Sequence, residues 1–169
     1  MDSLYGTNVR AVARLAERIA EVTGKPNPER ADVALVKAIS EPPGLKKRFT
    51  SFASKFCHFF VDEERFPVYD RAARRALRIH FGSHVRGADA SWSYREFCEA
   101  FFALAPATGP RVSFRGMDHY LWIVGEYWFW TRRSQPVNQE LREAFEAPAN
   151  RSILRALLPK PLSGEVKVA

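Results

Sequence analysis

The chain has 169 residues, which is enough to bury a real hydrophobic core within one domain. Its apolar content of 46% excludes a disordered chain, and its apolar runs are too short to cross a bilayer. The formal net charge is +7, and arginine supplies 19 of the 26 cationic side chains.

Helical periodicity runs through almost the whole chain, between residues that cap helices and residues that end them. The first predicted helix follows Thr7, and the second begins at Asn27-Pro28. The third runs from about Leu45 to Phe60, and the fourth from about Arg71 to Phe81. The fifth begins at a Ser93/Glu96 capping box, and the sixth runs from about Ser113 to Thr131. The seventh follows Asn138, and the eighth is capped by Asn150. We therefore expect an all-α fold of about seven to eight helices in a single domain over residues 1–160, with a frayed tail at 161–169.

Basic residues concentrate in two stretches that contain no acidic residue. The stretch between Asp70 and Asp89 contains Arg71, Arg74, Arg75, Arg78 and Arg86, and the stretch between Glu41 and Asp62 contains Lys46, Lys47, Arg48 and Lys55. A planar guanidinium group matches phosphate oxygens better than an ammonium group does. The two stretches therefore predict phosphate contacts with a nucleic acid, although a merely solvated basic surface would have the same composition.

Lys55 and Asp70 lie between the centres of these basic stretches. Lys55 has aromatic neighbours, whose low polarity would favour the neutral, nucleophilic amine. Asp70 follows the turn at Phe66-Pro67 and precedes a strong helix, so it can cap that helix and still project a carboxylate outward. The simpler interpretation of the same pattern is a helix, a turn and a capped helix with no chemistry.

The segment resembles the helix-hairpin-helix superfamily of DNA glycosylases, in particular the 8-oxoguanine branch that also has lyase activity. Lys55 in Ser51-Phe52-Ala53-Ser54-Lys55 and Asp70 in Phe66-Pro67-Val68-Tyr69-Asp70 match the superfamily's lysine and aspartate in order and local context. The hairpin before Lys55 has no glycine, so phosphate binding there would use Ser51, Ser54 or helix-terminal amides. The resemblance implies a diverged, minimal member.

The resemblance also implies roles for both residues. Asp70 would stabilise the positive charge that builds on the sugar as the base leaves. Lys55 would either attack C1′, which adds lyase activity, or hold a phosphate while Asp70 guides a water. An everted base needs aromatic faces and an edge partner. The candidates for this pocket or its support are His58, Tyr69, Trp122 and Asp118, each of which packs into the core or faces solvent in the alternative interpretation.

The predicted function is therefore a DNA glycosylase that removes a damaged or modified base, with bulky modified cytosines of phage DNA as a candidate substrate. The alternatives are a non-catalytic DNA- or RNA-binding module and a helical adaptor for an acidic protein. Metal-ligand spacing and a glycine-rich phosphate loop are missing from the sequence, so we expect no metal and no cofactor. Cys57 and Cys98 look like core thiols, and we expect a cytoplasmic monomer without a membrane partner.

Overall fold

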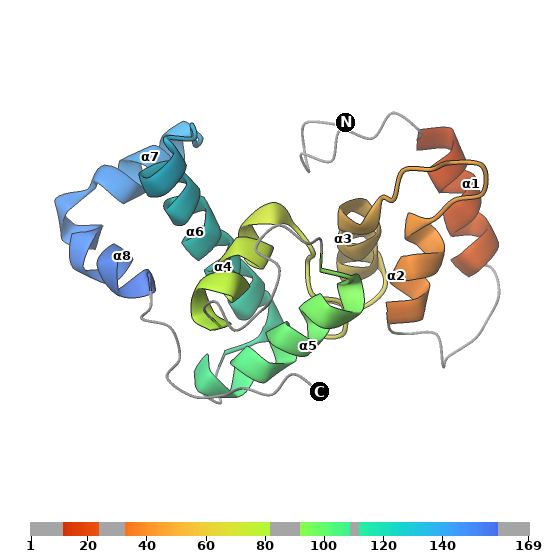
Figure 1. Ribbon diagram of the computed structural model, residues 1–169, viewed down its shortest axis with the longest axis horizontal. Coiled ribbons are helices and arrows are strands. Elements are labelled where there is room, and N and C mark those ends of the chain that lie inside the picture. The colour runs from red at the N-terminus through yellow and green to blue at the C-terminus, as the bar shows by residue number, and fades with distance from the viewer. Residues whose placement is uncertain (1–11, 24–32, 82–91, 109–111, 159–169) are drawn as a thin grey trace. The chain divides into compact units, whose positions relative to one another are not determined.

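The computed structural model describes residues 12–23, 33–81, 92–108 and 112–158, and these residues form helices and no strand (Figure 1). The α-helices of the described part are α1 (Val12–Thr23), α2 (Val33–Ser40), α3 (Thr50–Phe60), α4 (Arg71–Phe81), α5 (Tyr94–Leu104), α6 (Phe114–Arg133), α7 (Gln139–Glu146) and α8 (Arg151–Leu157). Short 3₁₀ turns, η3 (Ala105–Thr108) and η4 (Pro148–Asn150), follow α5 and precede α8. The predicted all-α class is confirmed.

Several predicted helix ends are confirmed by their capping bonds. The hydroxyl and amide of Ser93 both donate to Glu96 Oε2, at 2.7 and 2.6 Å, and the amide of Glu96 donates back to Ser93 Oγ at 3.3 Å. Asn138 caps α7, because its Oδ1 accepts the amide of Leu141 at 2.8 Å. The predicted caps at Thr7 and Asn27 lie outside the described residues, as does the predicted tail at 161–169.

One predicted helix start and one predicted side-chain cap are wrong. The third helix begins at Thr50 instead of near Leu45, because the chain first turns through Gly44, which has a positive φ of 78°. The amide of Phe49 then donates to the Ser40 carbonyl at 2.9 Å. Asn150 makes no side-chain cap for α8; its Nδ2 instead donates back to the Ala144 carbonyl at 3.0 Å.

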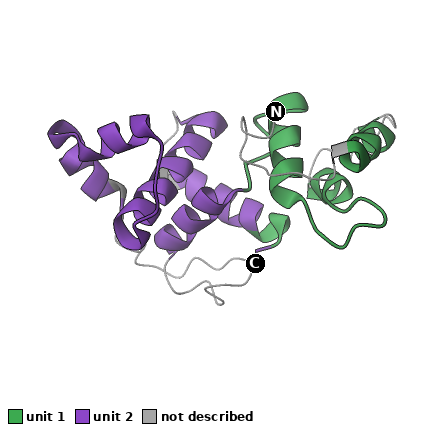
Figure 2. Cartoon of the chain, turned by 90° about the horizontal axis from the view of Figure 1, so that it is seen from above, with its two compact units in different colours: residues 1–69, 93–96 green, residues 70–92, 97–169 purple. Residues whose placement is uncertain are grey.

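The chain divides into two compact units (Figure 2). The first contains residues 1–69 and 93–96, and the second contains residues 70–92 and 97–169. In the first unit, α2 packs on α3 and α1 packs on α2. The side chain of Arg18 joins α1 to α2 by donating from Nε to the Ala38 carbonyl at 2.8 Å.

The second unit is built on the packing of α4 against α6. The side chains on the contact face of α4 are small, since the buried residues there include Ala72, Ala73 and Ala76. On α6, Gly125 lies directly against the α4 backbone, and a Cβ added to it would be 2.1 Å from the Ala72 carbonyl oxygen. The two helix axes can therefore approach this closely only because Gly125 has no side chain.

The two cysteines are buried and free, which confirms the prediction of core thiols. Burial raises the pKa of the Cys57 thiol to about 12, so it stays protonated and unreactive at neutral pH. None of the described helices is long and apolar enough to cross a membrane.

We predict that Gly125→Ala destabilises the protein by about 3 kcal/mol or more, because backbone atoms of α4 would have to move. Gly116→Ala is the matched control, since the nearest atoms to an added Cβ there are side chains at 3.4 Å. The control should change the free energy of unfolding by no more than about 1 kcal/mol. Urea denaturation of both variants measures the difference, and equal stabilities would contradict the close packing of α4 on α6.

Candidate functional site

Asp70 is held in place at the start of α4. Its Oδ1 accepts the amide hydrogen of Ala73 at 2.7 Å, which confirms the predicted cap. Its backbone carbonyl accepts from the Arg74 Nε at 3.2 Å. The bond to Ala73 therefore fixes the direction of the carboxylate, and the residue as a whole is half-buried.

A second carboxylate, that of Glu126 on α6, lies within electrostatic reach of Asp70. Burial raises the pKa of Glu126 above the ordinary glutamate value, the positive charge of Arg71 opposes this, and the negative charge of Asp70 raises it further. The side chain of Arg71 also donates a hydrogen bond to Gln135 Oε1. Asp70, Glu126 and Arg71 thus form a small charged cluster in the second unit.

Arginines of α4 lie over aromatic rings of α6. The guanidinium carbon of Arg71 is 3.9 Å from the centre of the Phe129 ring, and that of Arg75 is 4.3 Å from the centre of the Trp128 ring. Arg133, in the last turn of α6, lies 5.8 Å from the same Trp128 ring. We call these five residues the stacked-arginine surface. A cation–π contact of this kind restrains each guanidinium, whose N–H groups lie in its own plane and can bind phosphate oxygens.

The remaining predicted arginines of this stretch have other surroundings. Arg74 and Arg78 are half-buried on α4, and the guanidinium of Arg78 lies 5.5 Å from the ring centre of Trp92. Arg86 lies outside the described residues. The predicted phosphate-binding arginines therefore differ in how far they are available to a ligand.

Two polar side chains of α3, those of Ser54 and His58, form hydrogen bonds within the first unit. The Ser54 hydroxyl is fully buried, accepts the amide of Tyr69 at 3.0 Å and donates to the Ser51 carbonyl at 3.1 Å. The ring of His58 is also buried, and its Nδ1 donates to the Phe66 carbonyl at 2.9 Å. A phosphate contact by Ser54 would break these bonds, and His58 has the surroundings of a core histidine.

The other residues of the predicted base pocket are distributed over both units. Tyr69 is buried, with its ring edge against Tyr94 at a centroid distance of 6.1 Å. On α6, Asp118 is buried and Trp122 is 38% exposed. Tyr69 belongs to the first unit and the other two to the second.

The predicted basic residues before α3 are exposed, but two of them have partners. Arg48 pairs with Glu41 at 3.0 Å, and the Lys47 Nζ lies 5.5 Å from the centre of the Phe49 ring. Lys46 is exposed, and Ser51 and Lys55 are half-buried on α3. Lys55 lies in the first unit and Asp70 in the second, so the expectation that they share one cleft stays a prediction.

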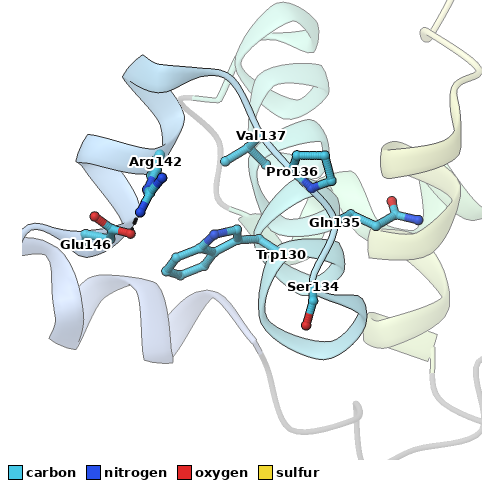
Figure 3. Close-up of a pocket in the computed structure, with 7 residues that line it drawn as sticks. All are labelled: Trp130, Ser134, Gln135, Pro136, Val137, Arg142 and Glu146. Atoms are coloured by element: carbon cyan, nitrogen blue, oxygen red, sulfur yellow. Dashed lines mark hydrogen bonds and ion pairs between the residues drawn. The ribbon is translucent and has the colours of Figure 1, made fainter.

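The sequence interpretation missed a pocket in the second unit. It has a volume of about 330 Å³ and lies between the end of α6, the segment after it and α7 (Figure 3). Its lining residues are Trp130, Ser134, Gln135, Pro136, Val137, Arg142 and Glu146. The only sequence signal is a proline-containing turn between two helices, which does not distinguish a pocket from an ordinary connection. In the described part of the chain, no group of three or more His, Cys, Asp and Glu side chains is placed to hold a metal ion.

Comparison with known proteins gives one partial match. A family model described as HI_0787_N, N-terminal domain, matches residues 1–65 of this chain. The match includes Lys55 and ends before Asp70. No curated protein and no solved structure matches the chain.

We predict that Glu126→Gln stabilises the protein at pH 7 by no more than about 1 kcal/mol, since the half-buried side chain keeps part of its solvation. The raised pKa means that the folded state favours the protonated form, so ionisation above that pKa costs stability. Below the unfolded pKa, near 4.5, both states are protonated and the gain should disappear. Thermal unfolding from pH 3 to pH 8 measures this trend, with Glu99→Gln on α5 as the control; a gain that is constant with pH would contradict it.

Proposed function

We propose that this protein is a DNA glycosylase that cleaves the N-glycosidic bond of a damaged or modified base everted from DNA. The observation that carries the proposal is the fixed, half-buried Asp70 carboxylate at the start of an arginine-rich helix. A negative charge surrounded by phosphate-binding cations is unfavourable for simple DNA binding, because it repels the DNA backbone. Such a charge is useful where positive charge develops on a deoxyribose.

The local geometry supports the proposed role of Asp70. The amide of Ala73 fixes one carboxylate oxygen and so holds the carboxylate in one orientation. During cleavage, the bond from C1′ to the base nitrogen breaks with its electrons moving to the base, and the sugar gains positive charge. A carboxylate that is already oriented stabilises this charge without reorganisation, which lowers the barrier.

The second catalytic group of the proposal is Lys55, in accordance with the resemblance to the helix-hairpin-helix glycosylases. Its neutral amine would attack C1′ as the base leaves and then lose a proton. Breakage of the bond from C1′ to O4′, with O4′ taking up a proton, would open the sugar ring to an imine that permits strand cleavage by elimination. In the alternative, Lys55 holds a phosphate and a water guided by Asp70 adds to C1′. We propose bulky modified cytosines, such as those of phage DNA, as substrates; release of 8-oxoguanine but of no modified pyrimidine would contradict this choice.

We predict that Asp70→Asn abolishes base release but leaves DNA affinity unchanged or higher, because asparagine keeps the capping oxygen and removes a negative charge. Asp62→Asn is the matched control, since Asp62 Oδ1 also accepts a local amide, from Glu64 at 2.9 Å. Mass spectrometry of free bases released from oxidised, deaminated, alkylated and phage-modified DNA measures activity. Wild-type protein that binds these DNAs and releases no base would overturn the proposal.

The second candidate function is a non-catalytic module that binds DNA or RNA through its phosphates. The stacked-arginine surface favours it, since oriented guanidinium groups need no catalytic partner to bind a nucleic-acid backbone. This function would use the same face of α4 and leave Asp70 only as a helix cap. Failure to bind DNA or RNA at low salt would exclude both candidates and favour the adaptor.

We predict that Arg75→Ala weakens DNA binding and lowers the slope of log K against log salt by about 1, because one phosphate contact is lost. Arg155→Ala, which removes an exposed arginine of α8, is the control for loss of one charge. Fluorescence anisotropy at several salt concentrations measures both variants. Equal slopes for the two variants would show that Arg75 does not contact phosphate.

A further inference from the structure

The pocket beside Trp130 is large enough for a small ligand. Its volume of about 330 Å³ is at the lower end of the range for ligand pockets, so it suits a single planar ring system better than an extended molecule. All lining residues belong to the second unit. In Figure 3, the Trp130 indole extends from α6 toward α7, with Pro136 and Val137 along one side.

The indole of Trp130 is held by two other rings. Its centroid is 6.0 Å from that of Tyr127 and 5.5 Å from that of Phe145, which is itself buried. Trp130 stays half-exposed, and one part of its surface contributes to the pocket wall. A rigid aromatic surface of this kind binds a planar ring with little loss of conformational entropy.

Polar groups around the pocket can pair with the edge of such a ring. Arg142 Nε and Glu146 Oε1 form an ion pair at 2.9 Å on the α7 side, which provides donors and acceptors next to one another. Both side chains are exposed, so they can rearrange around a ligand. Adjacent donors and acceptors suit a nucleobase, whose edge carries both kinds of group.

The pocket is connected to the stacked-arginine surface. Gln135, which lines the pocket, accepts the hydrogen bond from Arg71. Arg133 lies immediately before Ser134, another lining residue, and its guanidinium faces the Trp128 ring. A nucleotide with its base in the pocket would therefore have cationic groups near its phosphates.

We propose that this pocket binds one unpaired nucleobase of a DNA strand, which stacks on Trp130 while the strand's phosphates contact Arg71, Arg75 and Arg133. The inference rests on the DNA partner of the proposed function and does not depend on catalysis by Asp70. It assigns base stacking to Trp130, whereas the sequence suggested Trp122 among the residues of the base pocket or its support. The same ring chemistry occurs in a free mononucleotide, which the experiment must distinguish from a strand.

The test compares the affinities of the full-length protein for a short single-stranded oligonucleotide and for a matched strand with abasic residues. We expect wild-type protein to prefer the base-containing strand, and Trp130→Leu to lose about 5- to 100-fold of that affinity while abasic binding stays the same. Phe102→Leu is the control, since it removes an exposed aromatic ring of the second unit outside the pocket and should keep the preference. Equal losses in both variants, or no loss in Trp130→Leu, would overturn the proposal.

A second pair of variants covers the case in which Trp130→Leu does not fold. Pro136→Glu puts a carboxylate at the pocket, and Pro148→Glu puts one on η4; both prolines are exposed. Only the first should lower the preference for bases, by about tenfold or more, because a base would have to displace the carboxylate. Equal effects of the two variants would contradict the site.

A mononucleotide that binds as tightly as the oligonucleotide would overturn the assignment to a strand. DNA binding with the base preference but without base release would disprove the glycosylase and leave this pocket supported.

Discussion

The contact on which the second unit depends is the approach of α4 to α6 at Ala72 and Gly125. The missing side chain of Gly125 lets the two backbones meet. On each helix, residues four positions apart share a face, so Arg71 and Arg75 of α4 come to lie over rings that follow Gly125 on α6. Because α4 packs closely on α6, its guanidinium groups lie against aromatic rings and are restrained in orientation. Restrained guanidinium groups lose less conformational entropy when they bind phosphate.

In the first unit, polar side chains hold the segment that leads to Asp70. Ser54, His58 and Tyr94 bind backbone groups of Tyr69, Phe66 and Pro67 respectively. Three bonds, to Phe66, Pro67 and Tyr69, restrict that segment, and burial of Phe66 and Pro67 anchors it further. The physical value of Ser54 and His58 is therefore the positioning of a chain segment, and this holds for either candidate function.

The site contains both arginines and carboxylates, and the two candidate functions differ in whether they need the carboxylates. Arginines favour the approach of phosphates, whereas Asp70 and Glu126 oppose it. A pure binding surface gains no phosphate affinity from these carboxylates, although Asp70 still caps α4. A glycosylase needs one at the reacting sugar, and Asp70 is the carboxylate proposed for that role.

The sequence by itself determined the all-α class, the bounds of α4, the Ser93/Glu96 capping box and the Asp70 cap, because each depends on residues within about one helical turn. It could not predict the late start of α3, since that depends on the bond from Phe49 to Ser40 across a turn. Nor could it show that Ser54 is buried, that Arg75 lies over Trp128, or that Trp130 lines a pocket. These features arise where segments distant in sequence meet, and only the tertiary structure decides which face of a helix meets which neighbour.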